Sequence, residues 1–119
     1  MVRGIRGAIT VSENTREQIR EATQELLKAI VVENKLNLED IASAFFTVTA
    51  DLNADFPASS AREIGWHSVP LICSTEIPVP GSIERCIRVL LHVNTDISQR
   101  EIKHIFLREA ASLRKDLLA

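Results

Sequence analysis

Residues 86–96, CIRVLLHVNTD, are the most hydrophobic run of the chain and predict a central strand of a β-sheet. Alternate side chains of a regular strand share a face, so one face is fully apolar and comprises Ile87, Val89, Leu91 and Val93. The other face carries Arg88 among Cys86, Leu90 and His92. An isolated buried charge costs on the order of several kcal/mol. The Arg88 guanidinium therefore requires a partner.

The apolar face of this strand needs a covering layer, and the sequence contains one long helix that can supply it. Over residues 12–34 apolar side chains recur at spacings of three and four, as in an amphipathic helix of about five turns. Asn14 with Glu17, or Thr15 with Gln18, forms a capping box at its start. We expect a single domain over residues 1–119 in which this helix packs on a sheet.

Three further segments have the composition of strands. They are residues 2–11, 41–50 and 69–74, which are rich in β-branched or small side chains. In the first of them Arg6 shares a face with Gly4 and Ala8, so this arginine is flanked by small residues.

Two short helices complete the expected fold. Pro57 suits the first position of a helix that ends near Gly65, and Ser98 with Glu101 forms a capping box for another. The spacing of apolar residues would let this second helix continue to Leu113. No repeat or interdomain linker is visible.

Composition excludes several classes of function. Fourteen Lys and Arg against sixteen Asp and Glu give a formal charge of −2, and aromatic residues make up only 4%. A nucleic-acid interface, which needs basic surface and stacking rings, is therefore not expected.

No apolar run approaches the ~20 residues of a membrane span and no signal peptide is recognisable, so we expect a cytoplasmic protein without membrane contact. The two cysteines, which lack CxxC spacing, are expected to be reduced thiols.

Two explanations are open for Arg88. In the first, it pairs with a carboxylate such as Glu76, or extends to solvent at a sheet edge. In the second, Arg88, Arg6 and Arg62 converge on an anionic ligand, and Glu76 forms a hydrogen bond with another part of it. A guanidinium suits a carboxylate because its planar fork donates two parallel hydrogen bonds. Three arginines against one acid leave an excess of positive charge that favours a bound anion.

Nothing in the sequence predicts a metal, a cofactor or covalent catalysis. Cys73 is expected to be a small core residue, because no histidine is placed as its base. The three histidines lie in different elements, which does not favour metal ligation, and the glycine spacing matches no nucleotide-binding loop. Phe56 and Trp66 flank the first short helix and are expected to anchor a core or an interface.

Four blocks occur in an order and at separations that together form a specific pattern: RGIRGAITV, DLNADFPASSAREIGW, VPLICSTEIPVPGSIERCIRVLLHVNTD and LRKDL. In these blocks the chain resembles, over nearly its whole length, the monofunctional AroH-class chorismate mutases. The resemblance implies a single-domain mixed α/β fold, with one long and two short helices on a mixed sheet, that forms a trimeric pseudo-barrel. It also implies that the segment around Phe106 returns as a strand and does not continue the helix.

The resemblance further implies a reaction and its residues. Enzymes of this family convert chorismate to prephenate by a Claisen rearrangement, on the route to phenylalanine and tyrosine, without a cofactor or metal and in sites between the subunits of a homotrimer. By this resemblance Arg88 lies beside the breaking ether oxygen, Arg6 contacts a substrate carboxylate, and Glu76 accepts a hydrogen bond from the ring hydroxyl. The implied substrate-binding positions are Cys73 near that hydroxyl, the interface wall of Phe56, Ala58, Ser59 and Arg62, the pocket residues Leu71, Ile72 and Phe106, and the closing tail with Leu113 and Arg114.

Two positions depart from the family pattern. Phe106 stands where a tyrosine is frequent and Ser59 where a lysine can occur, so we expect weaker substrate binding with the chemistry retained. Cys73 and Glu76 are three residues apart, so both reach one ligand only if the strand bends or bulges between them. Two rival interpretations stay open: an imine or enamine deaminase of similar trimeric fold, and a non-catalytic amino-acid-sensing module.

Overall fold

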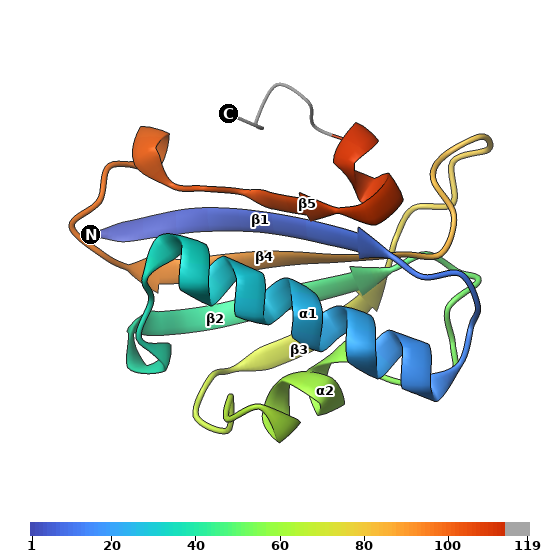
Figure 1. The fold of residues 1–119 in the computed structure, drawn as a ribbon, viewed down its shortest axis with the longest axis horizontal. Coiled ribbons are helices and arrows are strands. Elements are labelled where there is room, and N and C mark those ends of the chain that lie inside the picture. The colour runs from blue at the N-terminus through green and yellow to red at the C-terminus, as the bar shows by residue number, and fades with distance from the viewer. Residues whose placement is uncertain (114–119) are drawn as a thin grey trace.

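The fold is built on a mixed five-stranded sheet of order β3-β2-β4-β1-β5 in the computed structural model, which describes residues 1–113 (Figure 1). Its strands are β1 (Val2–Thr10), β2 (Ile41–Val48), β3 (Leu71–Thr75), β4 (Cys86–Asn94) and β5 (Ile105–Leu107). β4 pairs antiparallel with β1 and β2, while β3 and β5 pair in parallel at the two edges. The expected mixed α/β fold is confirmed, with β4 in the centre of the sheet.

One long helix, α1 (Arg16–Asn34), crosses in front of the central strands (Figure 1). The structure selects the second of the two possible caps, because Thr15 Oγ1 accepts the Gln18 N–H at 3.1 Å. The helix ends at Asn34, and the next residue, Lys35, has the left-handed conformation typical of a helix end. Within residues 1–113, no helix combines the length and the apolar character that a membrane span requires.

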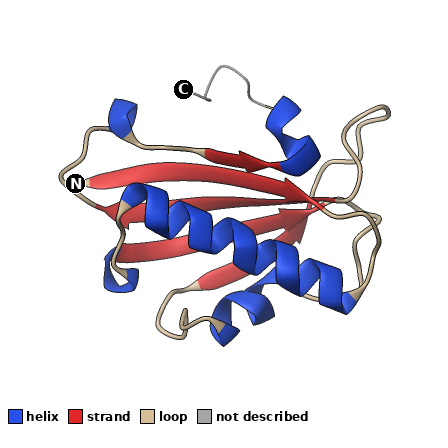
Figure 2. Cartoon of the chain, viewed as in Figure 1, coloured by secondary structure: helices blue, strands red, loops and turns tan. Residues whose placement is uncertain are grey.

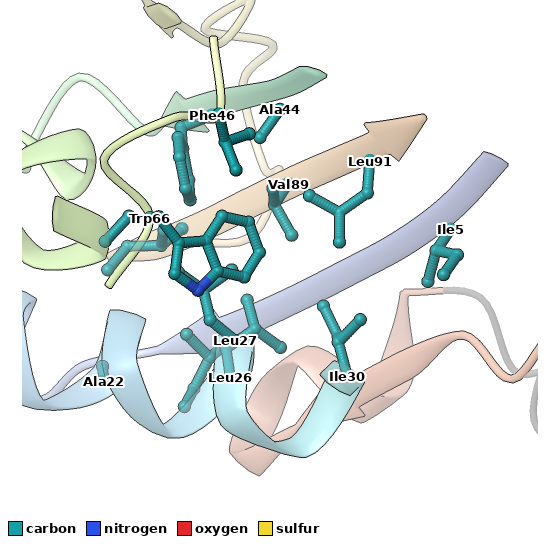
Figure 3. Packing of buried hydrophobic residues seen from close by; sticks show 14 of the residues in the cluster. Ile5, Ala22, Leu26, Leu27, Ile30, Ala44, Phe46, Trp66, Val89 and Leu91 are labelled. Carbon is teal, nitrogen blue, oxygen red and sulfur yellow. The ribbon is translucent and has the colours of Figure 1, made fainter. Parts of the chain in front are cut away.

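The core lies between α1 and the sheet. The predicted apolar face of β4 is buried throughout, from Ile87 to Val93. Figure 3 shows how side chains of α1, such as Leu26 and Ile30, meet Val89 and Leu91 of β4, with Trp66 packed beside them. Trp66 is only 1% exposed and is thus a core residue, whereas Phe56 is 67% exposed. Burial of the apolar stripe of α1 and the apolar face of β4 accounts for most of the stabilisation expected of such a domain.

A glycine in β1 allows α1 to approach the sheet closely. A Cβ atom at Gly7 would lie 2.7 Å from Ile30 Cδ1 and 3.2 Å from Leu26 Cδ1. Gly4 differs, because its Cβ would have only ordinary contacts, the nearest at 3.8 Å from Leu90 Cδ1. The helix therefore packs against the backbone of β1 immediately beside Arg6.

The short elements differ in detail from the prediction. α2 (Pro57–Glu63) begins at Pro57 as expected. β3 begins at Leu71 and not at Val69, because Pro70 has no N–H to donate to the ladder. The helix expected at Ser98 is a single 3₁₀ turn, η2 (Gln99–Glu101), although Ser98 Oγ donates to Glu101 Oε1 at 2.8 Å. A further 3₁₀ turn, η1 (Leu38–Asp40), precedes β2.

The C-terminal segment is a strand, as the family resemblance implied, and the helical interpretation from apolar spacing is wrong. β5 is followed by the 3₁₀ helix η3 (Arg108–Ser112), as Figure 2 shows. Ile105 and Leu107 pack against the main core, whereas Phe106 joins a second, smaller cluster with Ala8, Cys86 and Ala110. Side chains that point alternately to two sides are typical of a strand. Parallel pairing with the free edge of β1 stabilises this strand.

Candidate active site

Arg88 projects from β4 on the side of the sheet opposite the main core. Its neighbours across the ladders are Ala8 of β1 and Thr47 of β2. Its Nε atom lies 3.8 Å from Glu76 Oε2, and the two side chains are 29% and 28% exposed. The Nε atom is buried, and within residues 1–113 it has no hydrogen-bond acceptor. The internal ion pair considered from the sequence therefore exists, but it does not satisfy the guanidinium.

Glu76 is held by β2, immediately after β3 ends. Its backbone N–H donates to Val48 O at 2.8 Å, and its carboxylate accepts a hydrogen bond of 2.7 Å from Thr47 Oγ1. Thr47 was not predicted as a site residue. Its role follows only from the register that places Thr47 opposite Arg88, and no local sequence signal indicates that register.

Arg6 enters the same region from β1. Its guanidinium carbon lies 5.8 Å from the centre of the Phe106 ring, a distance at which a cation is attracted to an aromatic face. Phe106 itself is 6% exposed and packs in the small cluster with Ala8. Phe106 thus supports Arg6 from below, through a contact that needs no hydroxyl group.

Arg6, Glu76 and Arg88 line one open pocket of about 240 Å³. The other lining residues are Gly7, Phe45, Thr47, Val89 and Leu90. Two cations and one anion leave the pocket with a net positive charge, and its floor is a rigid sheet. The pocket is thus suited to an anionic ligand and contains neither a cysteine nor a histidine.

A second pocket, of about 400 Å³, contains most of the other predicted residues. It lies between α2 and β3 and is lined by Phe56, Ala58, Ser59, Arg62, Leu71, Ile72 and Cys73. Burial raises the pKa of the Cys73 thiol, although a hydrogen bond to the backbone of Ala58 and the charge of Arg62 oppose the shift. Cys73 is thus a neutral thiol at physiological pH, which suits a contact residue and not a nucleophile.

The two pockets share no residue. β3 and β1 are separated by β2 and β4, so the second pocket and Arg6 lie about three strand spacings, or ~14 Å, apart. Cys73 pairs with Phe46, which faces the core, whereas Glu76 reaches Arg88 on the opposite face. The ladder between β2 and β3 has no bulge, so one chain does not bring Cys73 and Glu76 to the same ligand.

The predicted closing tail is only partly described. Leu113 packs against the small cluster that contains Phe106 and Ala110. Arg114 lies outside the described residues. Among residues 1–113, no three His, Cys, Asp or Glu side chains are grouped so that they could hold a metal ion.

A single α+β domain whose sheet presents two arginines and one acid to an open pocket defines a small enzyme of the kind that acts on an anionic substrate through fixed charges. Comparison with known proteins gives the family. The sequence profile described as chorismate mutase type I matches residues 2–117, and the chain belongs to this family.

Individual relatives agree with this assignment. Over 118 residues the chain is 54% identical to chorismate mutase AroH of Thermus thermophilus, covering 98% of this chain and 97% of that protein. It is 44% identical over 118 residues to chorismate mutase AroH of Bacillus subtilis strain 168, covering 98% and 93%. A solved chorismate mutase from Clostridium thermocellum has a TM-score of 0.89 and 54% identity, covering 90% of this chain and 96% of that one. The resemblance found in the four sequence blocks is confirmed, and the deaminase and sensor interpretations are not favoured.

Proposed function

We propose that the protein converts chorismate to prephenate, and that the pocket of Arg6, Glu76 and Arg88 forms one half of its active site. In this rearrangement a C–O bond breaks while a C–C bond forms within the same molecule, so no proton, cofactor or covalent intermediate is needed. Catalysis then depends on holding the flexible dianion in a compact shape and on stabilising the charge that develops.

The observation that carries this proposal is the unsatisfied Nε of Arg88. A buried donor without an acceptor costs about 1–3 kcal/mol, and an oxygen of the substrate would relieve that cost. As the C–O bond breaks, negative charge grows on the ether oxygen. A guanidinium fixed in β4 would therefore stabilise the transition state more than the ground state, without any reorganisation.

The other two residues of this pocket orient the substrate. Arg6 binds a carboxylate of chorismate with its planar fork. Glu76, held in place by Thr47, accepts a hydrogen bond from the ring hydroxyl. Phe106 cannot donate a hydrogen bond to a carboxylate, and Ser59 adds no cation to the second pocket, so substrate affinity depends more heavily on the arginines.

The other half of the active site comes from a second copy of the chain, in a homotrimer with three shared sites. The pocket with Arg62 and Cys73 would face the pocket with Arg88 across each subunit boundary. This arrangement would unite the two sets of residues that one chain keeps in two separate pockets. The face around Arg88 also exposes apolar side chains that an interface would bury, namely Phe45, Ile72 and Leu90.

The decisive test of the activity is the disappearance of chorismate absorbance with purified protein. Formation of prephenate supports the proposal. Absence of turnover under conditions in which the protein is folded contradicts it, and hydrolysis of an imine or enamine substrate in place of chorismate would support the deaminase interpretation.

The shared site has a separate test in mixed assemblies. Arg88→Ala and Arg62→Ala damage different pockets, so each variant alone should be inactive or nearly so. Random mixing of the two chains in a cyclic trimer leaves one intact site in every mixed assembly, and about one quarter of wild-type activity should return. No recovery in trimers shown to be mixed, or an active monomer in sedimentation, contradicts the shared site.

The same proposal places the enzyme in the cytoplasm, where prephenate would be used for phenylalanine and tyrosine synthesis. Cys73 and Cys86 are both free thiols, which is the state that a reducing compartment maintains. Cell fractionation with a tagged chain tests the location, and recovery of the protein outside the cytoplasmic fraction contradicts it.

A further inference from the structure

The backbone N–H of Arg6 is bound by a side chain and not by a backbone carbonyl of a neighbouring strand. Its N–H donates to Nδ1 of His104 at 3.0 Å. β5 begins one residue later, at Ile105, where the parallel ladder opposite Gly7 starts. The imidazole of His104 thus takes the place of a backbone acceptor at the end of this ladder.

The direction of this bond agrees with the pairing of β1. On the same edge, Gly4 exchanges two hydrogen bonds with the Gln99 side chain, of 2.8 and 2.6 Å. Since the Arg6 N–H points toward His104, it does not point toward β4, and Arg6 and Leu90 form a non-hydrogen-bonded pair. Side chains approach each other more closely in such pairs.

The accepting nitrogen of His104 carries no hydrogen, so the ring proton of the neutral imidazole is on Nε2. Two residues further along, the ring of Phe106 lies beneath the Arg6 guanidinium. One short segment, residues 104–106, therefore holds the backbone of Arg6 at one end and supports its charged group at the other.

We propose that His104 is a positioning residue for substrate binding, which directs the Arg6 guanidinium into the pocket by accepting the Arg6 N–H. The inference rests on the proposed function, in which Arg6 binds a substrate carboxylate. His104 is not among the residues that line the pocket, so it acts through Arg6. A loss of its acceptor should therefore weaken binding more than it slows the chemical step.

Two substitutions at His104 and one control separate positioning from general stability. His104→Ala removes the acceptor, while His104→Asn retains one, because Oδ1 of asparagine stands close to the position of Nδ1. Gln99→Ala is the matched control, since it removes two side-chain bonds to the same edge of β1 at Gly4 and leaves the bond to Arg6 intact.

His104→Ala should raise KM for chorismate about 5- to 10-fold with kcat changed less than about 2-fold, the pattern of a lost binding contact. His104→Asn should restore KM to within about 2-fold of wild type. Gln99→Ala should lower Tm and leave KM unchanged. An unchanged KM in His104→Ala, no rescue by His104→Asn, or an equal rise of KM in Gln99→Ala overturns the inference.

Two further measurements keep the result interpretable. A spin–spin coupling across the hydrogen bond between the Arg6 amide nitrogen and His104 Nδ1, measured by NMR in wild-type protein, should be present, and its absence overturns the inference without any variant. Arg6→Ala tests the underlying function. If it leaves KM unchanged, the proposed role of Arg6 fails; if it raises KM while His104→Ala does not, only the positioning role fails.

Discussion

Arg88 Nε and Glu76 Oε2 lie 3.8 Å apart, within the range of an ion pair but beyond that of a hydrogen bond. The same carboxylate oxygen instead accepts a hydrogen bond of 2.7 Å from Thr47 Oγ1. Glu76 thus offsets part of the charge of Arg88 without occupying its Nε–H. A closer pair would leave the guanidinium less able to respond to an oxygen that becomes charged during the reaction.

Replacing Arg88 should lower kcat more than it raises KM. We expect Arg88→Ala to reduce kcat by ~10²–10³-fold, as for the loss of one preorganised electrostatic donor. Arg88→Lys should also be severely impaired, because an ammonium cannot reproduce the planar fork. Chorismate kinetics give the result, with Tm as a check on folding. Near-normal kcat in the lysine variant would show that charge alone is sufficient.

Cys73→Ser should retain kcat within about 10-fold of wild type, because we assign the thiol a contact role and no nucleophilic attack. A serine hydroxyl is similar in size and can still form a hydrogen bond with a ligand. The measurement is kcat and KM for chorismate, and Tm controls for folding. Complete loss of activity in a folded Cys73→Ser variant would reopen the question of covalent catalysis.

Cys86→Ala should make the protein less sensitive to alkaline pH. Burial raises the pKa of the Cys86 thiol, with the charge of Arg88 opposing the shift. The folded chain then keeps a proton that the unfolded chain loses, so the free energy of unfolding falls as pH rises. The stabilisation that the protonated Cys86 thiol contributes is complete below the ordinary thiol pKa, about 8.5. It is lost as pH rises through the raised pKa of the folded chain.

The measurement for Cys86→Ala is the urea midpoint between about pH 8 and about pH 10. The urea midpoint of the variant should decline less steeply with rising pH than that of wild type, whatever the stability of the variant at neutral pH. Ala110→Gly is the control, because it perturbs the same apolar cluster without removing a titrating group and should leave the slope unchanged. If the urea midpoint falls with pH at the same slope in wild type and in Cys86→Ala, the Cys86 thiol does not contribute to the loss of stability at alkaline pH.

Gly7→Ala should destabilise the fold by about 1–3 kcal/mol, the usual cost of overpacking a filled core. The added methyl group would lie 2.7 Å from Ile30 Cδ1, so the side chain of Ile30 or the whole of α1 must shift. Gly4→Ala is the control, because its methyl group meets only ordinary contacts. Urea unfolding of both variants tests the prediction, and equal stability of Gly7→Ala and wild type contradicts it.

Much of the fold was predictable because its signals are local. The alternation in residues 86–96 identified a central strand and its buried face, and the three- and four-residue spacing of residues 12–34 identified α1. The C-terminal segment was predictable only by family resemblance. Its apolar spacing also fits a helix, and what makes it a strand is the free edge of β1, which is distant in sequence.

The candidate site divides in the same way. Arg6, Glu76 and Arg88 could be singled out from the sequence, because charged side chains within or beside apolar strands require an explanation. Thr47 and His104 could not, because an ordinary threonine and an ordinary histidine gain their hydrogen bonds to Glu76 and Arg6 from strand register and strand order. The separation of the predicted site residues into two pockets could not be predicted from the sequence either, because it depends on the order of the strands in the sheet.

The amino-acid sequence by itself determined the family, the periodic elements and the presence of an arginine in the central strand, because these depend on the order of neighbouring side chains. Only the tertiary structure decided which groups meet Arg88, which atom accepts the Arg6 N–H, and that one chain carries two separate pockets. Those relationships arise from hydrogen-bond pairing between strands far apart in the chain, and a one-residue change in register would reverse the faces of a strand.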